Sequence, residues 1–221
     1  HNAYRNKLAG GEMPGWPTAA NMRQMSWDCQ IECVALRWAK QCVPGHDKCR
    51  STPMFGYVGQ NYAEAGSTAN FPTNDGGFIG WTDKEIGLIA NPASMVQKFQ
   101  GGAWGHFTQV VWAASYKLGC GEIHTTKGKF KYVVTVCNFG PGGNIYETEM
   151  YLTGTPASKC PDGTQISKEY PNLCSGSDNV APSKPNDTSA FECPVCSGVA
   201  FRRGILVLIV CALLQLNEII I

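Results

Sequence analysis

Eleven cysteines constrain this chain more than any other feature of its sequence. Ten precede an apolar C-terminal segment and suit up to five disulfides, which persist in oxidising compartments. They are Cys29, Cys33, Cys42, Cys49, Cys120, Cys137, Cys160, Cys174, Cys193 and Cys196, and the eleventh is Cys211. A zinc cluster competes with this interpretation, but the C-x-x-C at 193–196 has no second pair to complete four ligands. The sequence therefore predicts a secreted, disulfide-stapled protein, and its disulfide pairing cannot be read from the spacing.

The composition is that of a globular protein without a strong overall charge. Hydrophobic residues make up 43% of the 221 positions, enough for one packed domain with appendages. The net charge is +1, and no basic run extends beyond Arg202-Arg203. We therefore expect no nucleic-acid partner, because phosphate binding needs a concentrated positive field. The chain opens on His1 rather than methionine, which fits either a removed leader or a truncated N-terminus.

Periodicity and turn residues predict helices on both sides of a small antiparallel sheet. Helices are expected over 1–9, 27–42 and 77–89, with Asp28 as the N-cap of the second. The Gly, Pro, Asn and Ser content of 62–78 predicts a loop. Residues 117–123 and 130–138 are expected to be strands, joined by a hairpin loop over 124–129. The fold class that follows is α+β, a three-layer α-β-α sandwich stapled by disulfides.

Composition also divides the chain into four parts. Residues 1–155 hold the predicted sandwich, and 156–178 form a short Cys-bearing extension with few large apolar residues, which should depend on a disulfide. Residues 179–203 are a Ser/Pro/Asn/Asp linker that contains the C-x-x-C and a glycosylation sequon at Asn186. The apolar tail, 204–221, is too short for a clean membrane span. A lipid-anchor signal and a wrongly predicted last exon both remain open, so a membrane is a partner only if the tail is an anchor or anchor signal.

Two segments carry a specific resemblance to a known family. "GHFTQVVW" at 105–112 and "VCNFGPGGNIY" at 136–146 resemble the two signatures of the CAP superfamily, the cysteine-rich secretory, antigen five and pathogenesis-related type one proteins. The segments "HNAYRNKLA", "MSWDCQIECVALRWAKQC" and "LGCGE" match in order, although Phe139 stands where the family usually has tyrosine. The resemblance covers residues 1 to about 155. The cysteine pattern and short extension are most similar to the activation-associated secreted proteins of parasitic nematodes.

The resemblance implies a central cleft lined by two histidines and two acidic residues. Carried over position by position, the four residues are His46, Gln60, Glu85 and His106, so glutamine replaces one family glutamate. Two imidazoles and one carboxylate match the ligand set of an open zinc site, with Gln60 at a degenerate fourth position. Because Gln60 has no proton affinity to offer, we expect weak binding of Zn²⁺ or another divalent cation and no hydrolytic activity.

Other routes to hydrolysis find little support. Glu64 could replace the missing carboxylate only if its segment were helical, which Gly59 and Asn61 disfavour. The chain contains no G-x-S-x-G, no H-E-x-x-H and no G-x-x-x-x-G-K-[ST]. His124 in the hairpin loop is expected at the surface, and His1 is expected to have no catalytic role. The sequence thus predicts a protein that is not an enzyme.

The resemblance implies a secreted, non-catalytic protein of host interaction and immune modulation, with a divalent cation in its cleft. Its host protein or receptor would be met by loops such as 62–78 and 91–104. The alternative is an extracellular sterol or lipid carrier, in which Phe71, Phe78 and Ile79 would line a pocket. A hydrolase that uses His46, Glu85 and His106 is the weakest hypothesis.

Overall fold

A four-stranded sheet lies at the centre of the molecule. The structure is a computed structural model that describes residues 1–73 and 75–179. The strands are β1 (Ser26–Trp27), β2 (Gly59–Ser67), β3 (Lys117–Lys127) and β4 (Phe130–Gly140), in the order β1-β3-β4-β2. β4 pairs antiparallel with both β3 and β2, whereas β1 pairs parallel with β3. β2 is therefore an edge strand, with one side open to the segments around it.

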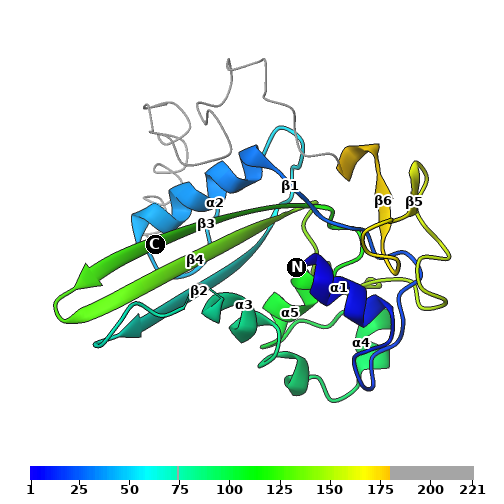
Figure 1. Cartoon of the computed structure of the whole chain (residues 1–221), viewed down its shortest axis with the longest axis horizontal. Coiled ribbons are helices and arrows are strands. Elements are labelled where there is room, and N and C mark those ends of the chain that lie inside the picture. Colours follow the sequence, from blue (N-terminus) through cyan, green and yellow to red (C-terminus); the bar gives the residue numbers. More distant parts are fainter. Residues whose placement is uncertain (74, 180–221) are drawn as a thin grey trace, which may run out of the picture.

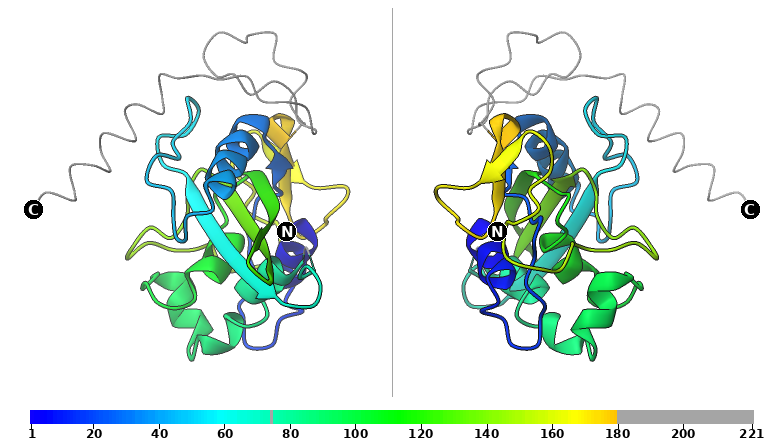
Figure 2. Two further views of the ribbon diagram at one scale, coloured as in Figure 1. Left: turned by 90° about the vertical axis from the view of Figure 1, so that its left-hand side faces the viewer. Right: turned by 90° about the vertical axis from the view of Figure 1, so that its right-hand side faces the viewer.

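Helices cover both faces of this sheet (Figure 1). α2 (Cys29–Gln41) lies on one face. The other face carries α1 (Asn2–Ala9), α3 (Gly76–Trp81), the 3₁₀ turn η1 (Ile86–Leu88), α4 (Pro92–Gln97) and α5 (Gly105–Val110). Figure 2 shows the same separation into layers from two further sides. The prediction of an α+β, α-β-α sandwich is confirmed.

The two faces of the sheet bury different side chains, as the alternation of a strand requires. Val134 and Val136 of β4 pack under α2 with Trp38. Cys137 and Phe139, which follow them along β4 and point to the opposite face, belong to the larger cluster beneath the other helices. Each residue of β4, and of β2 opposite it, can therefore be assigned to one face from its position in the register.

Close packing explains why α2 lies where it does. Asp28 Oδ1 accepts hydrogen bonds from the backbone N–H groups of Gln30 and Ile31, both at 3.0 Å, so the predicted N-cap is confirmed. A Cβ atom at Gly119 would lie 2.1 Å from the backbone nitrogen of Glu32, and one at Gly121 would lie 2.2 Å from the Cα of Leu36. These two glycines of β3 allow the helix backbone to rest directly on the strand.

Several predicted boundaries differ from the structure. Residues 62–67, expected in a loop, are strand β2, because pairing with the β-branched residues of β4 overrides their weak propensity. The helix expected over 77–89 is wrong in length, since α3 ends at Trp81 and is followed by turns and η1. The hairpin loop is two residues long rather than six, and the segment 91–104 contains α4. Pairing and packing decided these boundaries more than local composition did.

Disulfides staple the sandwich, but one predicted cysteine is not part of them. Cys120 and Cys137 are directly opposite in β3 and β4 and form a disulfide. Three more predicted cysteines, Cys29, Cys33 and Cys49, are also disulfide-bonded. The prediction for Cys42 is wrong: this residue follows the last turn of α2 in a left-handed conformation (φ 53°), and its thiol is free and exposed. Cys193, Cys196, Asn186 and the tail 204–221 lie outside the described residues.

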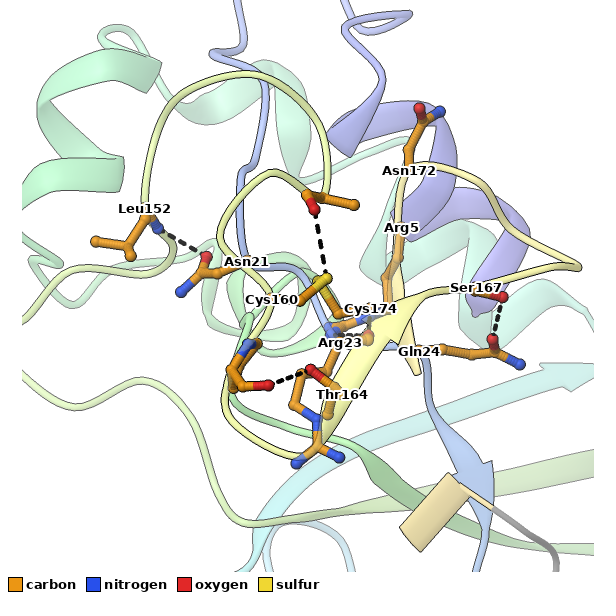
Figure 3. The surroundings of a disulfide bond; sticks show 12 residues. Arg5, Asn21, Arg23, Gln24, Leu152, Cys160, Thr164, Ser167, Asn172 and Cys174 are labelled. Atoms are coloured by element: carbon orange, nitrogen blue, oxygen red, sulfur yellow. Dashed lines mark hydrogen bonds between the residues drawn. A yellow bond between two sulfur atoms is a disulfide. The ribbon is translucent and has the colours of Figure 1, made fainter. Parts of the chain in front are cut away.

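The Cys-bearing extension packs on the segment that follows α1. Cys160 and Cys174 form the disulfide expected there, beside the small sheet of β5 (Thr164–Ile166) and β6 (Cys174–Gly176). The Cys174 backbone N–H donates to Met22 O (2.8 Å). Ser167 Oγ donates to Gln24 Oε1 (2.6 Å), as Figure 3 shows. The short 3₁₀ turn η2 (Ser177–Asn179) follows. Within residues 1–73 and 75–179, no helix has the length and apolarity needed to cross a bilayer.

Candidate functional site: a pair of histidines

Gln60 and Asn61, adjacent residues of the edge strand β2, contact the two segments that carry the histidines. Gln60 lies opposite Asn138, which in turn lies opposite Gly119, so Gln60 belongs to the face covered by α2. Asn61 points to the other face, where its Nδ2 donates to the backbone carbonyl of His106 (3.0 Å). The site therefore straddles the edge strand, with one histidine reached from each side.

Gln60 fixes the first histidine through its side-chain amide. Gln60 Oε1 lies 3.2 Å from His46 Nδ1 and accepts a hydrogen bond from the backbone N–H of Asp47 (2.8 Å). Its Nε2 donates to Asn138 Oδ1 (2.9 Å), directly across the strand pair. Because an amide oxygen only accepts, His46 must carry its proton on Nδ1.

The segment that carries His46 has no helix or strand and is held by side chains. Trp38 Nε1, in α2, donates to the carbonyl of Gly45 (2.8 Å), the residue before His46. Arg50 Nε donates to the carbonyl of Val58 (2.5 Å), and Arg50 Nη1 donates to that of Asp47. Three separate attachments, including Gln60, thus place one imidazole beside the edge strand.

Glu85 fixes the second histidine. Its Oε1 accepts from His106 Nδ1 (2.6 Å), and its Oε2 accepts from the backbone N–H of Phe107 (3.0 Å). The Phe107 N–H lies in the first turn of α5, where backbone donors have no intrahelical acceptor, so the carboxylate also caps the helix. The Trp81 ring stacks on His106 with centroids 6.0 Å apart, and the Glu85 side chain is only 12% exposed.

The second signature segment holds α5 in place. Asn144 Nδ2 donates to the carbonyl of Gly105 (2.7 Å), and Thr108 Oγ1 donates to Asn144 Oδ1 (2.8 Å). The backbone N–H of Gly143 donates to Gln109 Oε1 (2.8 Å). The two signature segments therefore contact each other. This contact positions the first turn of α5, which carries His106.

The structure brings all four predicted residues together, but in unequal roles. The His46 and His106 rings are 6.0 Å apart between centroids and inclined by 47°. Gln60 and Glu85 each face the Nδ1 atom of one ring rather than a common centre. In a neutral imidazole that donates from Nδ1, the lone pair is on Nε2. A neutral ring held in this way has its Nε2 atom, and not its Nδ1 atom, free of a proton.

Burial favours the neutral form of the first histidine. The pKa of His46 is lowered from its ordinary value by burial, and the nearby His106 and Arg50 lower it further. The hydrogen bond to Gln60 acts in the opposite direction. A lowered pKa keeps the Nε2 lone pair available at neutral pH.

The donor set fits a divalent cation only weakly. Two imidazoles on one tetrahedral to linear metal centre would have ring centroids about 5–6.5 Å apart, and the observed 6.0 Å falls in this range. However, residues 1–73 and 75–179 contain no group of three or more His, Cys, Asp or Glu side chains arranged to hold a metal. Glu64 does not compensate, since it lies in a strand and accepts a hydrogen bond from Tyr62. The residues therefore fit a two-nitrogen site completed by water.

Sequence reasoning missed two residues that shape this cleft. Trp81 and Asn138 stood inside segments that were singled out, but their stacking and cross-strand roles depend on the three-dimensional pairing. His124 is exposed, as expected, and contacts Glu122. Of the side chains suggested for a lipid pocket, Phe78 packs against His1 whereas Phe71 lies against His124. Ile79 is exposed.

Known proteins share both the sequence and the fold. The model of the CAP family, described as the cysteine-rich secretory protein family, matches residues 1–139. The chain is 41% identical over 162 residues to venom allergen 5 of Rhynchium brunneum, covering 68% of each chain. It is 37% identical over 178 residues to a cysteine-rich venom protein of Tityus serrulatus, covering 79% of this chain and 44% of that protein.

Two solved structures are similar over 79% of the chain. Na-ASP-1 has a TM-score of 0.63 and 28% identity, with 45% of its own length covered. The crystal structure of NaASP2 with Zn²⁺ has a TM-score of 0.61 and 29% identity, with 90% covered. This chain thus spans less than half the length of the Tityus serrulatus protein and of Na-ASP-1. By its family match and its relatives, the chain belongs to the CAP family, the cysteine-rich secretory proteins.

Proposed function

We propose that this chain is an extracellular, non-catalytic binding protein whose cleft takes a divalent cation weakly through Nε2 of His46 and of His106. The observation that carries the proposal is the pairing of each Nδ1 atom with its own acceptor, Gln60 or Glu85. Acceptors of this kind orient metal-ligating histidines in other proteins. The Zn²⁺ in the similar NaASP2 crystal structure and the disulfides, which suit an oxidising compartment, are consistent with it.

Each cleft residue then has a defined task. His46 and His106 would ligate the ion, while Gln60 and Glu85 hold the rings and the tautomers. When bound, the cation would supply positive charge and open coordination positions that a partner's oxygen atoms could occupy. Since only two protein ligands contribute, the affinity should be lower than at a site with three.

Binding is favoured over hydrolysis because no free base faces the cleft among these residues. Both carboxylate oxygens of Glu85 already accept hydrogen bonds, from His106 and from Phe107. Gln60 has an amide in place of a carboxylate and cannot take a proton from water. A water bound at these two histidines would therefore meet no uncommitted carboxylate at residue 60 or residue 85, which supports a binding role.

The partner in this proposal is a host protein or receptor, with immune modulation as the outcome. The segment that carries His46 also exposes three large apolar side chains, Val43, Met54 and Tyr57. Such exposed side chains beside a cation site suit contact with another protein.

Calorimetric titration of the disulfide-intact protein with Zn²⁺ tests the proposal. His46→Ala and His106→Ala should each abolish measurable binding, because one imidazole alone is a poor site. His124→Ala is the matched control, since it removes an exposed histidine outside the cleft, and it should leave binding unchanged. Equal binding by all three variants, or cleavage of a broad peptide library by the native protein, would contradict the proposal.

A further inference from the structure

The β3–β4 hairpin extends beyond the helical layers of the sandwich (Figure 1). We define the hairpin tip as residues 65–73 and 124–133, from the end of β2, the segment after it and the facing ends of β3 and β4. Strand pairing joins these pieces, since Ser67 pairs with Lys131 and Lys127 pairs with Phe130. Gly128, at φ +59°, makes the two-residue turn that ends the hairpin. The tip is thus a single structural unit.

The hairpin tip is the basic end of a nearly neutral protein. It contains Lys127, Lys129 and Lys131 and no Asp or Glu. Without these three, the chain keeps 15 of its 18 basic residues against 17 acidic ones, so the remainder is net negative. This asymmetry would orient the molecule tip-first towards an anionic surface.

Aromatic side chains accompany these lysines on both faces of the tip. Phe130 is 40% exposed and Phe71 is 38% exposed. Lys129 Nζ lies 6.0 Å from the Phe130 ring centroid, and Lys131 Nζ lies 5.9 Å from that of Phe71. Phe130 shares its face with Lys127, its cross-strand partner, whereas Lys131 and Phe71 lie on the opposite face. Each exposed ring therefore has a cation beside it.

We propose that the hairpin tip docks onto anionic lipid bilayers. Phe130 and Phe71 would enter the boundary between head groups and acyl chains, while the three lysines face lipid phosphates and carboxylates. An apolar ring flanked by lysines suits this boundary. The methylene chains of the lysines can lie beside the ring among the acyl chains, while their ammonium groups stay in the head-group layer. Clustered lysines add attraction to anionic lipid that falls off with salt.

The exposed rings favour a bilayer over a soluble polyanion as the partner. A sulfated polysaccharide would be bound through the lysines alone and would leave Phe130 in water. A bilayer uses both kinds of side chain. The docking also needs no internal cavity, so it differs from carriage of an extracted lipid.

Vesicle flotation tests the proposal on the full chain, in EDTA so that the cation cleft plays no part. The vesicles are phosphatidylcholine alone or with about one third phosphatidylserine. The triple variant K127Q/K129Q/K131Q should bind anionic vesicles about a hundredfold more weakly, at about fivefold for each lysine. Its matched control, K84Q/K159Q/K168Q, removes three exposed lysines elsewhere and should change binding less than about threefold.

A second pair of variants isolates the aromatic contribution. Phe130→Ser keeps every lysine and should weaken vesicle binding about fivefold, whereas Ile166→Ser, at an exposed apolar residue of β5, should not. All variants retain residues 180–221, so differences between them report on the tip. Equal binding by both triple variants, an unchanged Phe130→Ser, or equal flotation with neutral vesicles would overturn the proposal. Binding to heparin without binding to vesicles would also overturn it.

Discussion

The two histidines of the cleft are held in different ways, although their rings are only 6.0 Å apart. His106 lies in the first turn of α5, which packs on the main core, is capped by Glu85 and is hydrogen-bonded to the second signature. His46 lies in a segment without helix or strand, which side chains attach to α2 and to β2. One half of the site is built into a helix on the core, and the other lies in a segment without helix or strand that hydrogen bonds and the disulfide of Cys49 hold in place.

This difference shows how a glutamine can serve at residue 60, where the resemblance predicts a glutamate. On the His106 side, a carboxylate both orients the ring and caps α5. On the His46 side, Gln60 can orient the ring with its carbonyl, and Asn138 accepts from its amide nitrogen. The glutamine therefore holds the His46 ring without a negative charge.

The largest loss of stability is expected from Glu85→Ala, which removes the contacts that hold His106 and the first turn of α5. It leaves the Phe107 N–H without its acceptor and His106 Nδ1 without a partner, so the free energy of unfolding should fall by about 2–4 kcal/mol. The control is Glu122→Ala, which removes another carboxylate–histidine contact, at the more exposed His124, and should cost under about 1 kcal/mol. Urea denaturation measures both, and equal losses would contradict the account.

The two histidine substitutions should differ in stability even though both abolish cation binding. His106→Ala leaves Glu85 Oε1 without its imidazole and removes the ring that Trp81 stacks on, which should cost about 1–2 kcal/mol. His46 lies at the surface, although its ring is desolvated enough to lower its pKa, so His46→Ala should cost under about 0.5 kcal/mol. Thermal unfolding without metal measures both losses. A larger loss for His46→Ala than for His106→Ala would contradict this difference between the two sides of the site.

Substitutions of Gln60 should change the affinity for Zn²⁺. Gln60→Leu frees the His46 ring and should weaken Zn²⁺ binding about tenfold. Gln60→Glu should strengthen binding several-fold by adding negative charge behind His46. The Asn138 Nδ2 atom is buried without a partner among the described residues, so this amide can turn to donate to the new carboxylate. An affinity unaltered in both variants would show that residue 60 does not support the cleft.

A smaller effect concerns pH. The pKa of His46 is lowered by burial, so the folded state binds this proton less readily than the unfolded chain. The resulting contribution to stability is present above the ordinary pKa of 6.5 and is lost as the pH falls below it. His46→Gln should therefore lose less stability than the wild type between about pH 7.5 and about pH 5.5 in urea denaturation. Identical losses would contradict the burial of this imidazole.

Much of the scaffold was predictable because its signals are local or lie within the signatures. Asp28 before an amphipathic run predicts a helix start, and "GHFTQVVW" with "VCNFGPGGNIY" predicts the cleft. The glycines of "LGCGE" were matched to the family, but only the structure shows that they admit α2.

The remaining features depend on contacts between distant residues. Ala63 and Ala65 have little strand preference, and their strand exists because β4 pairs with it. The role of Gln60 as an acceptor for His46 follows from the cross-strand position of Asn138, which no spacing in the sequence encodes. The sequence around Cys42 does not distinguish its free, exposed thiol from the cysteines that form disulfides.

A crystal structure of the zinc-soaked protein, with the ion located by its anomalous scattering, tests the central claim most directly. We expect one ion bound by Nε2 of His46 and Nε2 of His106, with Gln60 and Glu85 still on the Nδ1 atoms. An ion held by the Glu85 carboxylate without His46, or ions on the two histidines separately, would contradict it.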